Sequence, residues 1–569
     1  MFHRSLRSRF AAGGALVLII VGGSAALVPQ KPEAAALVPA AHAPGPATVR
    51  RLSADQYRNI IHDVFGRSLD LGGYFEPDLR ISGLLAVGSG KVGITPAGME
   101  QYDAMARSIA GQVADEDHRA QMIPCAPKSA DAADDACAGA FLARVGRLLY
   151  RRPLSEDQLE AYVDAAAIAA RTTGDFYQGI EFSLAAMLSS PQFLFREART
   201  VPARGSVHVL DAYAKASQLS FFLWNSGPDL LLLEAAAKGV LDRPRGLSRE
   251  VDRMMESPRL EAGLRAFFTD NFGFDKITSL TKDAAIFPEF SAQVAEDAQE
   301  QTLRTILDVV LTRNADYREI FTTKKTFLTQ QLGSIYRVPA ISDAPNGAPD
   351  TWQEYEFAAD DPRAGILTHI SFTALHSPAG RGSPTLRGKA LREIMMCQPV
   401  PPPPGDVPFN IINDTSNPLY RTARKRLAAH AANPVCAGCH KITDPIGLAL
   451  ETFDGQGKFR TTENRETLDT SGTLDGVAYQ DAAGLARAVR DNPATTTCIV
   501  NRLSAYALGR ATAPGEKAWV AHLQKAFADG GYRATTLMRA IAVSREFYTV
   551  SPPALEQSAS APASTGETR

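Results

Sequence analysis

The sequence lacks an excess of charge of either sign. Its 569 residues carry 60 Lys and Arg against 62 Asp and Glu, which gives a formal net charge of −2 at pH 7. A near-neutral chain without a basic patch does not attract polyanions over a distance, which excludes nucleic acid as a partner. The composition, 45% hydrophobic and 21% charged, is that of a globular protein and not of an acidic disordered chain. At about 100–200 residues per domain, the length allows about three to five domains.

Catalytic signatures are also missing. The sequence contains no G-x-S-x-G nucleophile elbow, no phosphate-binding loop, no H-E-x-x-H zinc motif and no dinucleotide-binding fingerprint. Reactions that depend on these motifs are therefore not predicted, and the sequence identifies no catalytic residue.

Long hydrophobic runs are absent except near the N-terminus. Arg4, Arg7 and Arg9 precede an apolar run over residues 11–28, and an Ala- and Pro-rich segment follows it. A basic start, an apolar stretch and small residues are typical of an export signal. The run is somewhat long, so an uncleaved anchor is the alternative, and a surface-lying or buried helix is a third interpretation. We expect residues 1–45 to be a signal peptide or N-terminal anchor and the rest to be periplasmic or secreted, with membrane contact only through such an anchor.

Cysteine is scarce, but two of the six cysteines form an informative motif. Cys436-Ala-Gly-Cys439-His440 has the spacing of a c-type haem attachment site. In such a site each thiol adds to one vinyl group of the porphyrin, and the adjacent histidine binds the iron. The alternative is that these residues form an incidental surface turn that binds no cofactor. We predict one covalent haem c bound by Cys436, Cys439 and His440, with His440 as the proximal ligand of the iron.

The remaining four cysteines allow three pairings. Cys125 and Cys137 are twelve residues apart, which favours a disulfide between them, and Cys397 and Cys498 then pair by elimination and bracket the haem motif. An oxidising compartment supports both bonds. Four buried reduced cysteines are one alternative. Another is a zinc site that adds ligands from His430, Cys397 or Cys498 to the motif, although no second C-x-x-C or H-x-x-x-H is present.

The distal ligand of the iron is not fixed by the sequence. No methionine lies between His440 and Met538, where a sixth ligand is commonly found. The candidates are Met395, Met396 and His430, followed by His369 and His376. An open sixth position is the alternative, and it matters because an open iron binds oxygen, peroxide or substrate, whereas a His/Met iron only passes electrons.

Other groups are expected around the haem. The second ring nitrogen of His440 needs a fixed acceptor, for which we predict a backbone carbonyl in a turn over residues 444–447. Several basic side chains near the motif are expected to be solvated surface charge, with pairing to the haem propionates as the alternative. These are Arg387, Lys389, Arg392, Lys458 and Arg460.

Helical periodicity dominates after residue 50. Ser53 with Gln56, and Ser155 with Gln158, match the capping box that begins a helix. Further helices are predicted at 230–239, 248–274, 290–313, 317–337, 482–491, 495–508 and 516–528, with a small turn or hairpin at 469–479. We therefore predict a mostly α fold, a multi-module helical protein with a C-terminal c-type haem-binding helical module.

The predicted organisation follows shifts in periodicity and composition. The expected parts are 1–45, signal peptide or anchor; 46–115, N-terminal helical module; 116–200, helical module; 201–340, central helical module; 341–435, loop, helix and proline-strut module; 436–550, haem c and C-terminal helical module; and 551–569, disordered tail.

Several stretches resemble one family. CAGCHKITDPIGLALETFDGQGKFR resembles the C-terminal C-x-x-C-H module of the planctomycete-type cytochrome c-like family, large secreted multi-domain proteins built of domains of unknown function. The likeness covers most of residues 50–550 and is also carried by RLSADQYRNIIHDVFG, LLYRRPLSEDQLEAYV, LSFFLWNSGPDLLLLEAAAKG, SPTLRGKALREIMMCQPVPPPPGDVP and YALGRATAPGE. The resemblance implies a mostly helical secreted or cell-surface protein with a c-type haem, but no established reaction. Many relatives begin with a separate C-x-x-C-H module, which this chain lacks, so a single haem is expected.

Two functions follow as expectations. The first is an exported c-type haem protein that acts in redox chemistry, as an oxidoreductase or an electron-transfer protein, with an unknown substrate or redox partner. The second is a redox-inert cell-surface scaffold, or a polysaccharide- or protein-binding protein, in which a haem or metal is only structural.

Overall fold

Helices form most of the structure, and the strands are two to four residues long. The computed structural model describes residues 43–203, 207–340, 351–403 and 410–552. The mostly α prediction is confirmed. Most of the predicted signal or anchor, and all but two residues of the predicted C-terminal tail, lie outside the described residues. In the part that is described, no helix combines the length and the apolar character needed to cross a membrane.

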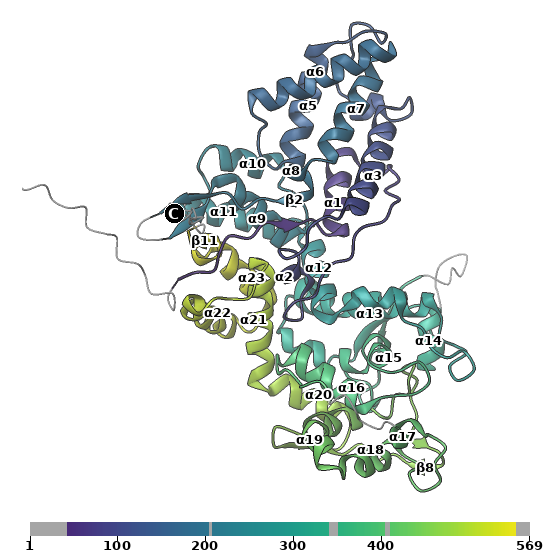
Figure 1. Cartoon of the computed structure of the whole chain (residues 1–569). Coiled ribbons are helices and arrows are strands. Elements are labelled where there is room, and N and C mark those ends of the chain that lie inside the picture. The colour runs from purple at the N-terminus through teal and green to yellow at the C-terminus, as the bar shows by residue number, and fades with distance from the viewer. Residues whose placement is uncertain (1–42, 204–206, 341–350, 404–409, 553–569) are drawn as a thin grey trace, which may run out of the picture. The chain divides into compact units, whose positions relative to one another are not determined.

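The first half of the described chain is a group of packed helices. Helices α3, α5, α6 and α7 lie side by side (Figure 1) and enclose a hydrophobic core that includes Tyr57 and Phe141. Both predicted capping boxes are present, at Ser53 and Ser155. The elements are β1 (Arg50–Arg51), α1 (Ala54–Phe65), α2 (Leu85–Gly88), α3 (Pro96–Ala114), α4 (Arg119–Met122), α5 (Asp135–Leu149), α6 (Glu156–Thr173), α7 (Phe176–Leu188), α8 (Pro191–Leu194) and β2 (Phe195–Arg196).

The central elements share a second and larger core with the C-terminal helices. They are β3 (Thr200–Pro202), β4 (His208–Leu210), α9 (Ala212–Trp224), α10 (Leu230–Ala237), α11 (Pro244–Met255), α12 (Leu260–Phe272), η2 (Phe274–Ser279), α13 (Ala292–Leu307), η3 (Asp308–Thr312), η4 (Tyr317–Phe321), β5 (Lys325–Leu328), α14 (Gln330–Tyr336), β6 (Gln353–Glu356), η5 (Ile366–Thr368) and α15 (Ile370–Leu375).

Two helical predictions need correction here. The stretch 248–274 is not one helix, because the chain breaks between α11 and α12 at Ser257-Pro258, where proline disfavours the helical conformation of the preceding residue. The stretch 317–337 is not helical throughout. It contains β5, whose Thr326 and Leu328 are buried while Lys325 and Phe327 are half-buried, and β5 pairs with β6 in an antiparallel ladder.

The last part carries the predicted haem motif and then returns to the centre. Strand β11 pairs with β4, so the end of the described chain adds to the sheet β11–β4–β3. The elements are α16 (Pro384–Ala390), η6 (Leu391–Met395), α17 (Asn410–Asn413), α18 (Ala423–Ala431), α19 (Pro434–Leu448), β7 (Thr462–Glu463), β8 (Glu466–Thr467), β9 (Gly472–Leu474), β10 (Val477–Tyr479), α20 (Ala482–Asp491), α21 (Pro493–Leu508), η7 (Pro514–Glu516), α22 (Lys517–Asp529), α23 (Ala534–Val543), η8 (Glu546–Tyr548) and β11 (Thr549–Val550).

Helix α19 packs against α16 through two glycines. A Cβ atom on Gly447 would lie 1.8 Å from the carbonyl oxygen of Pro384, and one on Gly388 would lie 1.9 Å from that of Thr443. The two backbones can approach this closely only because both positions lack a side chain. This contact fixes the helix that bears the C-x-x-C-H motif against the body of the protein.

Candidate functional site

The C-x-x-C-H motif occupies the first turns of α19. The helix begins because Asn433 accepts a hydrogen bond from the N–H of Val435 and Pro434 takes the first helical position. Cys436 and His440 are four residues apart, so they share a side of the helix, and Cys439 lies about 100° around from His440. Cys436 is buried, Cys439 is half-buried, and both are free thiols.

The other four cysteines form two disulfides. Cys125 is bonded to Cys137 and Cys397 to Cys498, with S–S distances of 2.06 and 2.04 Å. Both predicted pairings are therefore confirmed. The alternative of four reduced cysteines is wrong, and the thiols of Cys397 and Cys498 are not available to a zinc ion. Among the described residues, no group of three or more His, Cys, Asp or Glu side chains is placed to hold a metal ion.

The side chain of Asp444 orients His440. Its Oδ2 atom lies 2.7 Å from Nδ1 of His440, one helical turn earlier. Its Oδ1 atom accepts a hydrogen bond of 2.8 Å from the hydroxyl of Thr385 on α16, so the carboxylate is fixed from two elements. Asp444 is buried, with 7% of its surface exposed. An imidazole held at Nδ1 leaves Nε2 as the nitrogen for a ligand or substrate.

This contact corrects the predicted turn. Residues 444–447 continue α19, with Pro445 inside the helix, so the acceptor for His440 is a carboxylate and not a backbone carbonyl. The carbonyl oxygen of Pro445 instead accepts a hydrogen bond from the hydroxyl of Tyr479 in the predicted hairpin, which is present as β9–β10. Spacing of four residues along a helix brings His440 and Asp444 together.

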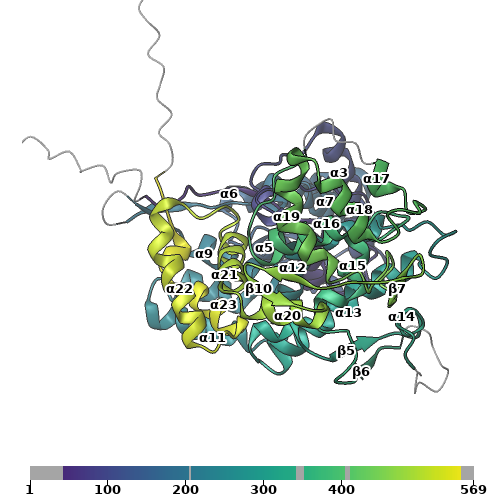
Figure 2. The ribbon, with the colours of Figure 1, turned by 90° about the horizontal axis from the view of Figure 1, so that it is seen from below.

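His430 lies next to His440. The rings are in edge-to-face contact with centroids 4.9 Å apart, and His430 comes from the last turn of α18, which packs beside α19 (Figure 2). Burial lowers the pKa of His430, and the neighbouring His440 lowers it further. His430 is thus the predicted distal candidate whose ring contacts His440.

The other distal candidates lie elsewhere in the described structure. Met395 and Met396 are in the large hydrophobic core, with 2% and 3% of their surface exposed. His369 is in a buried polar network in which Nδ1 lies 2.9 Å from the hydroxyl of Thr302. His376 packs its ring against Phe372.

A hollow of about 710 Å³ lies beside His440. Helices α18 and α19 and the β9–β10 hairpin form its walls, and its lining includes the apolar residues Leu427, Ala431 and Leu448. The volume is within the range of about 300–1,000 Å³ that cofactor sites occupy. Two free thiols and an imidazole with one nitrogen fixed are the donors that a c-type haem requires. Of the three motif residues only His440 lines the hollow, and the two cysteines lie outside its lining.

The expectation of solvated surface charge near the motif is wrong for Arg387 and Arg392, which are buried, whereas Lys389, Lys458 and Arg460 are half-buried. Arg387 is fully buried and donates to the carbonyl oxygens of Thr373, Leu450, Phe453 and Asp454. The remaining four are paired within the protein. Lys389 pairs with Glu393, Arg392 with Asp475, Lys458 with Glu289, and Arg460 with Glu451. Arg387 therefore holds the haem-motif region together from inside.

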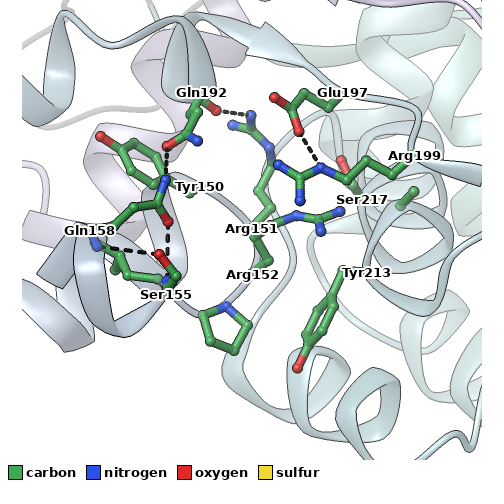
Figure 3. Close-up of a pocket in the computed structure, with 13 residues that line it drawn as sticks. Tyr150, Arg151, Arg152, Ser155, Gln158, Gln192, Glu197, Arg199, Tyr213 and Ser217 are labelled. Carbon is green, nitrogen blue, oxygen red and sulfur yellow. Dashed lines mark hydrogen bonds and ion pairs between the residues drawn. The ribbon is translucent and has the colours of Figure 1, made fainter.

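A separate pocket of about 300 Å³ lies in the first half of the protein (Figure 3). The arginines that line it, Arg151, Arg152 and Arg199, already form hydrogen bonds or ion pairs within the protein. Arg151 donates to backbone carbonyls, including that of Gln192, and Arg199 pairs with Glu197. Arg152 pairs with Asp211. This pocket presents no group that requires a ligand.

Five family models match the chain, and each is described as a protein of unknown function. They are DUF1587 at residues 50–115, DUF1595 at 137–197, DUF1592 at 210–338, DUF1588 at 363–463 and DUF1585 at 475–547. No curated protein and no solved structure matches the chain. The fold and the matches together define a mostly helical protein assembled from several modules. In particular, the chain carries five of the planctomycete cytochrome c-associated domains of unknown function, and the C-x-x-C-H motif lies within the DUF1588 match.

Proposed function

We propose that the chain is an exported c-type haem protein that acts in redox chemistry. The observation that carries this proposal is the side chain of His440, held at Nδ1 by the buried Asp444 and placed on one helix with the free thiols of Cys436 and Cys439. Two disulfides support an oxidising compartment, and therefore export.

Cys436 and Cys439 would hold the haem covalently, and His440 would bind its iron through Nε2. When bound, the haem supplies a one-electron couple. Asp444 keeps the proton on Nδ1 and increases the electron density of the ring, which favours the oxidised metal. Thr385 fixes Asp444, so the orientation of His440 depends on the contact between α16 and α19.

The neighbouring groups set access to the site. The hollow along α18 and α19 provides space next to His440. His430 contacts the ring of His440 edge-to-face and does not line the hollow. His430 is the distal candidate nearest to His440, but the two rings touch, so His430 would have to move away from His440 to leave room for an iron between them. An open sixth position would instead support catalysis on a bound molecule.

Absorption spectra of the full chain, matured with a haem-attachment system, test the proposal. We expect a sharp reduced α-band after dithionite, its loss in His440→Ala, and its retention in His522→Ala, a variant of an exposed histidine on α22. A band that shifts with carbon monoxide indicates an accessible iron, and a band that does not shift indicates electron transfer. Absence of haem absorption from the wild type contradicts the proposal and favours the redox-inert scaffold.

A further inference from the structure

Two buried arginines face each other across a short antiparallel ladder. Arg50 of β1 is the register partner of Arg196 of β2. Only 6% of the surface of Arg50 and 8% of that of Arg196 is exposed. Side chains at directly opposed positions of a ladder lie on the same face, so the two guanidinium groups are held on one side of it.

Neither guanidinium is compensated within the described residues. No hydrogen bond or ion pair to another described side chain or carbonyl satisfies either group, and the Nε atom of each is buried without a partner. The group of Arg196 lies 4.0 Å above the ring of Phe221. The group of Arg50 lies against Gly509, where a Cβ atom would come within 2.2 Å of Nη1. Buried charges in native proteins are nearly always paired, so two unpaired ones call for a missing partner.

Both arginines line a cavity of about 250 Å³. This is the volume of about eight water molecules, more than a single tetrahedral anion needs. The cavity also contains Asn225 and Tyr506, and the exposed Asp55 lies at its edge. Burial raises the pKa of the Tyr506 phenol, so its hydroxyl stays neutral. Burial lowers the pKa of Arg50 to about 10, and burial together with the charge of Arg50 lowers the pKa of Arg196 well below its usual range, so a bound anion would stabilise the charged form of both.

The carboxylates of Asp78, Asp270 and Asp275, of which only Asp270 is buried, already have partners. Asp270 accepts hydrogen bonds from the N–H groups of Leu85 and Ala86 and from Arg80. Arg80 also pairs with Asp275, and Asp78 pairs with Arg51. Each of these acids is therefore bound by donors other than Arg50 and Arg196, and none of them forms an ion pair with either arginine.

The cavity is assembled from four of the five matched domains. Arg50 belongs to the DUF1587 match, Arg196 to DUF1595, Phe221 to DUF1592 and Tyr506 to DUF1585. Sites for small molecules occur preferentially where domains meet. A ligand bound here would contact all four segments and stabilise their association.

We propose that this cavity binds a phosphate- or sulfate-type oxyanion carried on a small molecule, with Arg50 and Arg196 as its charged ligands. A dianion with several acceptor oxygens compensates both guanidiniums, whereas a carboxylate carries charge for one. The unused volume leaves room for a substituent on the anion. This site is independent of the haem motif.

Isothermal titration calorimetry of the full chain, at ionic strength matched with NaCl, tests the proposal. The probes are inorganic phosphate, inorganic sulfate, glycerol phosphate and acetate. We expect saturable binding of the tetrahedral anions, weak binding of acetate, and a loss of affinity of tenfold or more in Arg50→Met and in Arg196→Met. Arg539→Met, which removes a surface partner of Asp252, is the matched control and should leave the affinity unchanged.

The probes distinguish the sources of the anion. Tighter binding of glycerol phosphate than of inorganic phosphate supports a ligand in which the anion is an ester on a small molecule. Equal binding of the two supports the oxyanion site but contradicts the proposal that the anion carries a substituent. Arg50→Lys keeps the positive charge and is used if a methionine variant does not fold. Its affinity for phosphate should be lower than that of the wild type. No saturable binding to the wild type, or unchanged affinity in the arginine variants, overturns the proposal.

Thermal unfolding without added anion separates a ligand role from a structural one. Arg196→Met removes an uncompensated buried charge, so we expect its melting temperature to equal or exceed that of the wild type. Phosphate should raise the melting temperatures of the wild type and of Arg539→Met by more than that of Arg196→Met, in which only the general effect of the salt remains. A lower melting temperature of the variant in the absence of anion would assign Arg196 to the fold instead.

Discussion

Nδ1 of His440 lies 2.7 Å from Oδ2 of the buried Asp444. A carboxylate in this position is a stronger acceptor than a backbone carbonyl, because a hydrogen bond to a charged group is about twice as strong as a neutral one. The pair therefore fixes both the proton on Nδ1 and the electron density of the ring. In the proposed haem protein, this relationship sets the properties of the iron ligand.

Asp444→Asn should raise the reduction potential of the haem protein. The amide is a weaker acceptor, so the oxidised iron loses stabilisation, and a change of about 10–100-fold for an outer-shell partner corresponds to about 60–120 mV for one electron. Potentiometric titration followed by the α-band measures this shift. Asp529→Asn, an exposed residue at the end of α22 that pairs with Lys525, should not change the potential. Equal potentials in Asp444→Asn and the wild type would show that the carboxylate does not act on the iron.

Arg387→Met should destabilise the protein strongly. The variant leaves several buried carbonyl oxygens without a donor and leaves Glu451, 3.6 Å away, without one of its cations. Breaking a buried charged network of this kind costs about 3–5 kcal/mol. Urea denaturation followed by circular dichroism measures the loss as a lower midpoint. Arg107→Met, an exposed residue paired with Asp103, should change the free energy of unfolding by less than about 1 kcal/mol.

The two disulfides should contribute unequally to stability. Cys397–Cys498 closes a separation of 101 residues and Cys125–Cys137 one of 12. The chain-entropy model gives about 4.7 kcal/mol for a 100-residue loop and about 3 kcal/mol for a 15-residue loop. Double alanine variants of each pair, compared by thermal unfolding, should therefore show the larger loss for Cys397–Cys498. The opposite order would mean that strain or residual structure outweighs loop length.

His369 should make the protein less stable in mild acid. Burial lowers the pKa of His369 from 6.5 to about 3, so the unfolded chain binds a proton below pH 6.5 that the folded protein excludes. The stability is complete above pH 6.5 and falls as the pH decreases from 6.5 toward 3, by about 2 kcal/mol at pH 5 for this one group. His369→Gln should show a flatter dependence in urea denaturation at pH 5 and pH 8. His522→Ala should keep the wild-type slope, and an equally steep slope in His369→Gln would contradict this assignment.

Local sequence signals predicted the local structure well. Ser53 with Gln56 forms the expected capping box because both partners lie within one turn, and the hairpin at 469–479 forms around Asp475 and Gly476, both with positive φ. Cys125 and Cys137 pair across a short loop, as their proximity indicated. Each of these features depends on residues that are near one another in the chain.

Features that depend on distant partners were not predictable in the same way. The burial of Arg387 requires carbonyl oxygens more than 60 residues later, and nothing in its neighbours distinguishes it from a surface arginine. The Arg50–Arg196 pair requires the β1–β2 ladder, whose two-residue strands are too short to give a periodic pattern. The contact of His440 with Asp444 could have been found from its four-residue spacing, had the helix been predicted to continue through Pro445.

The covalent haem is the central claim, and mass spectrometry of the protein purified from its native host tests it most directly. We predict that the peptide containing Cys436 and Cys439 carries one haem, which stays attached through acid–acetone extraction and is absent from a double alanine variant of these two cysteines. An unmodified peptide from the native protein, with both thiols free or bound to zinc, would contradict it.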